Sequence, residues 1–285
     1  MVIVQLIGGL GNQMFQYAFG LWLANERNTE LITNAFLLDN KVLARLRNYT
    51  SRNFELSVFG IDKPRSSPFD FIRAILPVKS NTALLREPRG GSTALSLPPS
   101  TVERVVCIGY WQSEEYFKSA ESIIRQKFTF QQPVNAFTQR ITESVQNSQQ
   151  PVFVHVRRGD YVTNANASHH HGVCGPEYYK HAIAYVRERV QNPHFYVFSD
   201  DLAWVKHELG FSLNPVTYVD GHRGRDSWQD MFLMSQCRHA ILANSSFSWW
   251  GAWLNPEAER IVVAPQKWFV TKSADSVLPD RWIKI

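Results

Sequence analysis

Two adjacent arginines, Arg157 and Arg158, directly follow the apolar segment PVFVHV, residues 151–156. A guanidinium group keeps its charge at physiological pH and can pair with two phosphate oxygens at once. We therefore interpret the pair as a binding site for a pyrophosphate group. The alternative is that one arginine pairs with Asp160 or Asp200 and only fixes the loop.

Two adjacent carboxylates, Asp200 and Asp201, follow the next apolar segment, FYVF. They could bind a divalent metal ion together with nucleotide phosphates, accept hydrogen bonds from a purine or ribose, or cap the following helix. We expect one of them to cap the helix and the other to remain available to a ligand.

A third polar cluster, Asn244, Ser245 and Ser246, follows the apolar segment HAILA. Small hydroxyl residues that lead into a helix offer hydroxyls and backbone N–H groups to an anion. This cluster therefore strengthens the phosphate interpretation of the arginines. The tryptophans that follow, in SFSWWGAW, are expected to pack in the core, with one ring available to the ligand.

A glycine-rich turn, GGLGNQ, follows the first apolar segment of the chain. Gly9 and Gly11 form a G-x-G pair, but Met14 stands where a dinucleotide fingerprint needs its third glycine, and no Gly-Lys-Ser/Thr follows. Neither NAD nor a P-loop nucleotide is favoured. The amide pair Asn12 and Gln13 at a helix start suits the close approach of a sugar or phosphate; the alternative is a tight turn and nothing more.

Histidines and cysteines give weaker signals. The run His169–His171 could bind a metal ion, but consecutive histidines in a loop are more typical of a mobile segment that contacts substrate. Cys107, Cys174 and Cys237 are odd in number, far apart and without zinc-ligand spacing, which suits a reducing cytoplasm.

The elements that must position these residues alternate between strands and helices. In the first half we expect a strand at 2–6, a helix at 12–25, a strand at 30–33, loops around small elements at 61–105, and an amphipathic helix over SEEYFKSAESIIRQKF. In the second half, short apolar strands alternate with helices, the first of which has Pro176 in its first turn. We therefore expect an α/β protein with a parallel sheet covered on both faces.

The carboxyl ends of parallel strands form one edge of a sheet, where ligands bind in open α/β folds. All four polar clusters follow expected strands, so they would line one cleft if the two halves face each other. A chain of 285 residues favours two domains.

Composition narrows the function classes. The net charge of +5 comes without a long basic run, so we expect no nucleic-acid partner; it suits an anionic small molecule or an anionic membrane surface. The amino-terminal stretch lacks a basic region and is interrupted by glycines, so we expect neither a signal peptide nor a membrane span. These features predict a cytoplasmic protein. Its basic balance also allows peripheral association with the inner face of the membrane.

Five motifs together resemble, in order and spacing, the bacterial α-1,2-fucosyltransferases: GGLGNQMFQYA, GYWQSEEYF, HVRRGDY, FSDD and ANSSFSWWGAWL. The resemblance covers nearly the whole chain. It implies a GT-B fold of two facing Rossmann-like domains, an acceptor-binding domain at 1–150 and a donor-binding domain at 151–285. It also implies inverting, metal-independent transfer of L-fucose from GDP-fucose to the 2-hydroxyl of a terminal β-galactoside such as lactose, without a cofactor.

The resemblance also implies roles for individual residues. His155 and Asp201 would contact the guanosine, Arg157 would bind the β-phosphate, and Arg158 would support the loop. Ser245, Ser246 and the Phe247 backbone would complete the phosphate and base pocket, while Asn12 would approach the phosphate or the reacting sugar from the other domain.

The general base is less clearly indicated. We expect Asp160 in this role because it shares a loop with the arginines; a structural role that fixes the arginines is the alternative, and a histidine of 169–171 is the second candidate. Two other function classes stay open. One is a metal-dependent nucleotide-sugar transferase that uses Asp200 and Asp201, and the other is a non-catalytic nucleotide-sugar or glycan-binding module.

Overall fold

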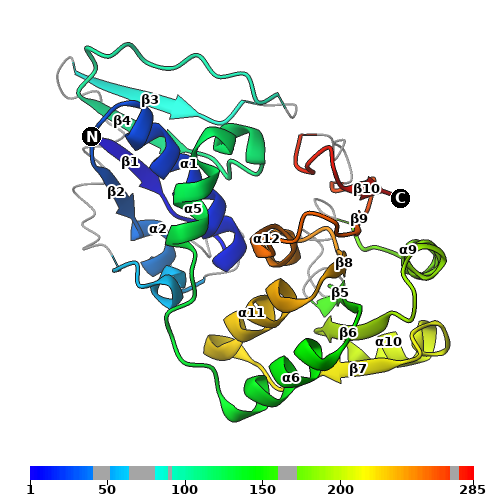
Figure 1. Ribbon diagram of the computed structural model, residues 1–285. Coiled ribbons are helices and arrows are strands. Elements are labelled where there is room, and N and C mark those ends of the chain that lie inside the picture. Colours follow the sequence, from blue (N-terminus) through cyan, green and yellow to red (C-terminus); the bar gives the residue numbers. More distant parts are fainter. Residues whose placement is uncertain (41–51, 64–80, 89–91, 160–171, 270–275) are drawn as a thin grey trace. The chain divides into compact units, whose positions relative to one another are not determined.

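The computed structural model describes residues 1–40, 52–63, 81–88, 92–159, 172–269 and 276–285. The chain forms two compact units, Met1–Gln132 and Pro133–Ile285 (Figure 1). Both contain a parallel sheet with helices, so the expected α/β class is confirmed. The division precedes the expected boundary at residue 150, because helix α6 (Ala136–Asn147) packs against helix α11 (Trp228–Gln236) of the second unit.

The first unit contains a four-stranded sheet in the order β2-β1-β4-β3, and every neighbouring pair is parallel. Its strands are β1 (Val2–Gln5), β2 (Leu31–Asn34), β3 (Thr82–Arg86) and β4 (Arg104–Ile108). Helix α1 (Leu10–Glu26) joins β1 to β2, as the sequence predicts. It lies directly on the sheet because Gly20 has no side chain: a Cβ there would come within 2.4 Å of Val4.

The region 61–105 differs from the expectation of loops around small elements. Residues 64–80 and 89–91 lie outside the described part, yet this region supplies β3 and the start of β4. Strand β4 is central, with Val105, Val106 and Cys107 buried. Strand β3 is at the edge of the sheet and leaves Leu84 39% exposed, so its sequence lacks the continuous apolar run of a buried strand.

The expected helix over SEEYFKSAESIIRQKF is only partly helical. Two 3-10 turns precede the short helix α5: they are η3 (Glu114–Tyr116) and η4 (Lys118–Ala120), and α5 spans Glu121–Lys127. The buried face is nevertheless the expected one, since Phe117, Ile124 and Phe128 are buried. In the described part of this unit, the remaining helical elements are α2 (Phe36–Asp39) and η1 (Leu56–Phe59).

The second unit contains a six-stranded sheet in the order β10-β9-β8-β5-β6-β7, with every neighbouring pair parallel (Figure 1). Its strands are β5 (Pro151–Val156), β6 (His194–Ser199), β7 (Val216–Val219), β8 (His239–Ile241), β9 (Val262–Ala264) and β10 (Ile283–Lys284). The chain runs from β5 outward to β7 and then returns to β8 on the other side of β5. This is the strand order of a Rossmann fold, with the switch point between β5 and β8.

Helices join these strands where the sequence predicts them: α9 (Pro176–Arg189), α10 (Leu202–Glu208), α11 and α12 (Ser246–Leu254), with the 3-10 turns η5 (Gly210–Ser212) and η6 (Gly224–Asp226). Pro176 is in the first turn of α9, as expected. The tryptophans Trp249, Trp250 and Trp253 of α12 are all buried, so no ring of this group is available to a ligand.

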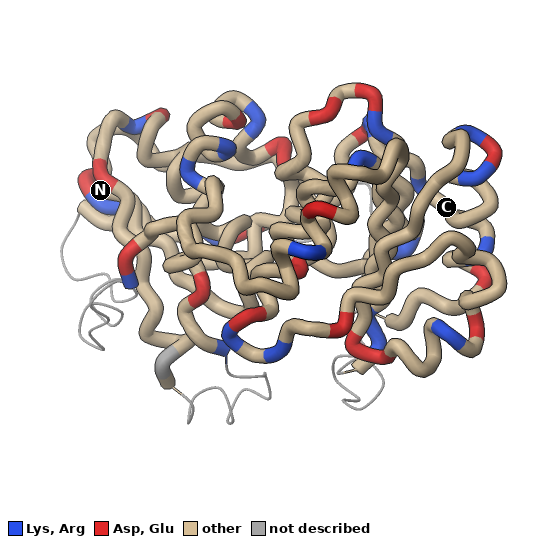
Figure 2. The backbone as a smooth tube through the Cα atoms, turned by 60° about the horizontal axis from the view of Figure 1, so that its bottom comes forward, with Lys and Arg blue, Asp and Glu red and all other residues tan. Residues whose placement is uncertain are grey.

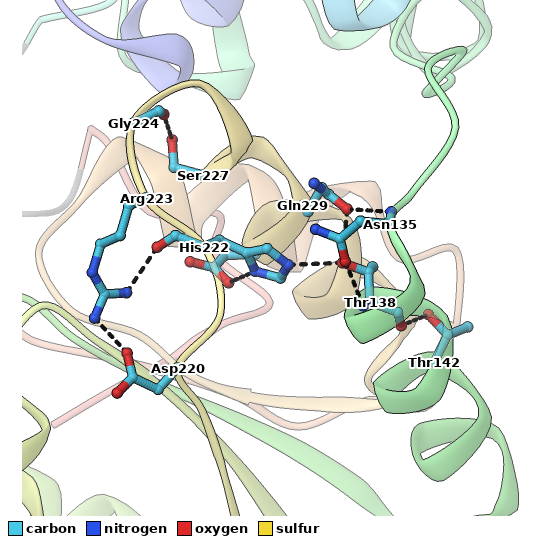
Figure 3. Close-up of polar contacts among 10 residues, drawn as sticks. Asn135, Thr138, Thr142, Asp220, His222, Arg223, Gly224, Ser227 and Gln229 are labelled. Atoms are coloured by element: carbon cyan, nitrogen blue, oxygen red, sulfur yellow. Dashed lines mark hydrogen bonds and ion pairs between the residues drawn. The ribbon is translucent and has the colours of Figure 1, made fainter.

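A buried polar network fixes α6 to the second unit (Figure 3). The Thr138 hydroxyl lies 2.7 Å from His222 Nε2 and donates to Gln229 Oε1 at 2.7 Å. His222 Nδ1 lies 2.6 Å from Asp230 Oδ1. The Asn135 backbone N–H also donates to Gln229 Oε1, at 2.8 Å. The network therefore joins α6, the loop after β7 and α11.

The number of protons in this network follows from its donors and acceptors. The single Thr138 proton is directed at two amide oxygens, Gln229 Oε1 at 2.7 Å and Asn135 Oδ1 at 3.1 Å, so His222 Nε2 must donate to the Thr138 oxygen. The short contact between His222 Nδ1 and Asp230 then needs a second proton, carried either by the ring or by the carboxyl group. Burial raises the pKa of Asp230, which favours retention of that proton.

We predict that Thr138→Val destabilises the second unit by about 1–3 kcal/mol, because it leaves His222 Nε2 and Gln229 Oε1 buried with one partner fewer. Urea unfolding followed by tryptophan fluorescence measures this. Thr142→Val is the matched control: the Thr142 hydroxyl makes one local bond to the Thr138 carbonyl at 2.8 Å, so its loss should cost less. Equal effects of the two variants would contradict the prediction.

Candidate active site

The two arginines after β5 are fastened to the two aspartates after β6. Arg157 Nη1 lies 3.2 Å from Asp200 Oδ2, and the Arg158 backbone N–H donates to Asp200 Oδ1 at 2.8 Å. Arg158 Nε donates to Asp201 Oδ2 at 3.3 Å. The register explains this: Val156 pairs with Ser199, so the two strands end side by side. The pairing of an arginine with Asp200, which the alternative expected, is therefore present, and phosphate binding by Arg157 stays a prediction.

The two aspartates have different tasks. Asp201 Oδ1 accepts the Trp204 backbone N–H at 3.0 Å and caps α10, as expected for one of the pair. The carboxylate of Asp200 is also engaged, because one oxygen pairs with the Arg157 side chain and the other accepts the Arg158 backbone N–H. Among the described residues, no three His, Cys, Asp or Glu side chains gather where they could bind a metal ion.

The two arginines also differ in their surroundings. The Arg158 guanidinium lies over the Trp204 ring, 4.1 Å from its centroid, and pairs with Asp201 on one edge. This side chain is 20% exposed, whereas that of Arg157 is 31% exposed. Arg158 is thus packed as a support, and Arg157 is the more accessible cation.

The switch point brings α12 next to this loop, because β8 pairs with β5. Ser245 is the N-cap of α12, and its hydroxyl accepts the Phe247 N–H at 3.3 Å. The rings of Phe247 and His155 have centroids 6.0 Å apart, which links α12 to the end of β5. The structure therefore brings Ser245, Ser246 and Phe247 to the same edge of the sheet as the arginines.

The Asn244 side chain is buried and forms hydrogen bonds with other residues of the protein. It is 2% exposed. Its Nδ2 donates to the carbonyls of Gly172 and Trp268 at 3.3 Å, and its Oδ1 accepts from Cys174 Sγ at 3.5 Å. Asn244 thus fixes the strand end, and its contact with a donor stays a prediction.

His155 at the end of β5 is a buried neutral group. Burial and the nearby Arg157 charge lower the pKa of His155 to about 3. Its Nδ1 has no hydrogen-bond partner within the described part of the chain. A neutral imidazole cannot neutralise a phosphate, but it can hydrogen-bond an uncharged nucleoside edge.

The lowered pKa of His155 predicts acid sensitivity. The unfolded chain takes up a proton near pH 6.5 and the folded protein only near 3, so stability is present above pH 6.5 and falls as the pH drops through this window. The slope is about 1.4 kcal/mol per pH unit. We expect His155→Gln to flatten the fall in unfolding free energy between pH 6 and 4. The exposed His207→Gln is the control; identical slopes for both variants would refute the assignment.

The first unit carries its own polar turn, at the carboxyl end of β1, the strand that pairs with β4. Gly8 has φ +79°, and a Cβ there would come within 2.5 Å of Asn12 Nδ2, so this position requires glycine. Gln13 is buried: its Nε2 donates to the carbonyls of Gly8 and Asn53 at 2.8 Å, and its Oε1 accepts the Glu55 N–H at 2.9 Å. Gln13 therefore shapes the turn.

Asn12 is partly exposed in the first turn of α1, and its Oδ1 accepts from Gln112 Nε2 at 2.8 Å. Gly9 is the N-cap of α1, and Gly11 is buried in its first turn. The sequence did not single out Gln112, although this residue lies in the motif GYWQSEEYF, and no motif marks Glu55. Asp160 and His169–His171, the two candidates for the general base, lie outside the described residues.

The fold and the site together define a class of protein. NodZ, an alpha-1,6-fucosyltransferase whose crystal was soaked with GDP-fucose, matches this chain with a TM-score of 0.50 and 15% identity, over 90% of this chain and 92% of that one. The likeness gives the fold alone. The fold is of the GT-B class of glycosyltransferases, as expected.

The chain belongs to glycosyl transferase family 11, whose model matches residues 95–285. It is 36% identical to the alpha-1,2-colitosyltransferase of Escherichia coli, over 100% of this chain and 98% of that protein. It is also 32% identical over 157 residues to galactoside alpha-(1,2)-fucosyltransferase 2 of Gorilla gorilla gorilla, covering 53% of this chain and 46% of that protein. The family resemblance recognised in the motifs is confirmed, and the protein is a glycosyltransferase.

Proposed function

We propose that this protein transfers L-fucose from GDP-fucose to the 2-hydroxyl of a terminal β-galactoside such as lactose, with inversion at the anomeric carbon. The observation that carries the proposal is Arg157, held by Asp200 at 3.2 Å beside the serines of α12 at the switch point of a Rossmann-like unit. The relatives' names, with their alpha-1,2 linkages, favour this linkage.

The chemistry assigned to the site is a single displacement. The bond between the fucose anomeric carbon and the β-phosphate oxygen breaks, while a bond to the acceptor oxygen forms on the opposite face. Negative charge develops on the departing GDP, and Arg157 stabilises it. The proton of the acceptor hydroxyl passes to a general base, for which we propose Asp160.

We further propose that no metal ion and no other cofactor is required. The guanidinium of Arg157 supplies a fixed cation where a metal ion would otherwise neutralise the pyrophosphate. The two aspartates that could have bound such an ion are paired with arginines, Asp200 with Arg157 and Asp201 with Arg158. Transfer should therefore continue in EDTA.

A second donor is favoured by one finding, the 36% identity to an alpha-1,2-colitosyltransferase over the whole chain. Colitose is L-fucose without its 3-hydroxyl group, so both GDP-sugars present the same phosphates to the arginines. Discrimination then depends on polar groups near the 3-hydroxyl, because a site built to bond a hydroxyl strongly rejects the analogue that lacks it.

The deciding experiment measures transfer to lactose from GDP-fucose and from GDP-colitose, each with EDTA and with added Mg²⁺, and identifies the linkage by NMR. An α-1,2-fucosyl product in EDTA, with at least tenfold preference over colitose, supports the proposal. A preference for GDP-colitose would mean that GDP-colitose, and not GDP-fucose, is the donor. Transfer only with Mg²⁺ favours the metal-dependent class, and nucleotide-sugar binding without turnover favours a binding module.

We propose action in the cytoplasm at the inner face of the membrane. No helix in the described part of the chain is long and apolar enough to span a bilayer. Charges of both signs are interspersed along the described chain (Figure 2), so attraction to an anionic surface would come from the net charge of +5. Sedimentation with anionic vesicles at low and high salt tests this.

A further inference from the structure

Three side chains of the first unit gather at the Gly8–Gly9 turn, which follows β1 beside its neighbour β4. The Asn12 amide lies against Gly8, where an added Cβ would be 2.5 Å from Nδ2. The Glu55 carboxylate lies against Gly9, where a Cβ would be 3.7 Å from Oε2. Gln112, from the loop after β4, bonds Asn12 at 2.8 Å.

The position of Glu55 is fixed from two sides. Its backbone N–H donates to Gln13 Oε1 at 2.9 Å, and its carboxylate accepts the Leu10 N–H in the first turn of α1. Burial raises the pKa of Glu55, while the Leu10 N–H and the charge of Arg52 lower it. No other part of the derived mechanism uses this partly buried carboxylate.

The loop that carries Gln112 is fixed as well. Glu87, just after β3, accepts the backbone N–H groups of Tyr110 and Trp111 at 2.7 and 3.0 Å. Trp111 is buried, whereas Tyr110, two residues before Gln112 in the chain, is 44% exposed. The loop after β4 therefore carries an exposed aromatic residue as well as the Gln112 amide.

A carboxylate, two amides and an aromatic ring are the groups that recognise a sugar. Carboxylates accept hydrogen bonds from hydroxyls, amides both donate and accept, and a ring can cover an apolar sugar face. We propose that Glu55, Asn12 and Gln112 form the subsite that binds the hydroxyls of the acceptor hexose, with Glu55 as its main determinant of affinity. The inference rests on the proposed transfer to a sugar acceptor.

The test compares Glu55→Gln and Gln112→Ala with the wild type, and uses the exposed Glu30→Gln as the matched control. Kinetics give the KM for lactose, the KM for GDP-fucose and kcat. Saturation-transfer NMR gives lactose binding with GDP present and without turnover. Because hydrogen bonds to a charged group are stronger than those to a neutral one, we expect Glu55→Gln to weaken lactose binding about 10- to 100-fold.

For Gln112→Ala we expect a smaller loss of lactose affinity, because Asn12 loses its partner but keeps its own amide. The KM for GDP-fucose should stay within about twofold in both variants. Unchanged lactose binding in Glu55→Gln would overturn the subsite, as would a fall in kcat at constant lactose affinity. If the wild type bound lactose but transferred no sugar, the proposed function would fail while the subsite remained.

Discussion

Arg157→Ala is expected to lower the rate of sugar transfer about 10²–10³-fold, the usual cost of removing one positioned charge donor from a transition state. Arg157 is the more accessible of the two arginines and is aligned by Asp200 at 3.2 Å. The loss should appear in kcat, because negative charge on the leaving GDP is greater in the transition state than in the bound donor.

Two further variants test whether the loss of rate is specific to the guanidinium group of Arg157. Arg157→Lys keeps the charge without the bidentate fork, so it should recover part of the rate. Arg189→Ala removes an arginine that pairs with Glu188 on the surface, and it should leave transfer unchanged. Full activity of Arg157→Ala would show that another group stabilises the leaving GDP.

Asp200→Asn is expected to lower transfer about 10- to 100-fold although we assign Asp200 no contact with substrate. The substitution removes the charge that aligns Arg157 and weakens the bond to the Arg158 N–H, and small displacements of positioning groups cost about that much. Asp201→Asn is the matched control. Asparagine also caps helices, and Arg158 keeps its stacking on Trp204, so a smaller loss is expected.

Gly159→Ala is expected to disturb the Asp200 carboxylate without changing Asp200 itself. A Cβ at Gly159 would lie 2.9 Å from Asp200 Oδ2, the oxygen that pairs with Arg157, so the contact between these groups must readjust. We expect the kinetic defect of Gly159→Ala to resemble that of Asp200→Asn. If Asp201→Asn were as damaging as Asp200→Asn, and added Mg²⁺ restored activity, the aspartates would act as metal ligands instead.

The sequence predicted the second unit well because its central strands β5, β6, β8 and β9 are buried. Such strands read as short continuous apolar runs, and β5 and β6 stand out for this reason. Polar residues that follow such runs must lie at the carboxyl edge of the sheet, which is why the sequence alone assigns Arg157 and Ser245 to one site.

The first unit was predicted less completely because its evidence is not local. Strand β3 lies at an edge and is half exposed, so its composition does not distinguish it from a loop. The partners Asn12 and Gln112 are 100 residues apart, and their contact depends on β4 being inserted beside β1.

The sequence by itself determined the family, the alternation of strands and helices, and the residue types of a phosphate site. Only the tertiary structure decided that Asp200 aligns Arg157, that Asn244 is buried and hydrogen-bonds the Trp268 carbonyl, and that Glu55 lies against Gly9. The reason is physical. Residue type and short-range spacing set the chemistry and the local structure, but strand order and register set which loops meet, and these depend on packing across the whole sheet.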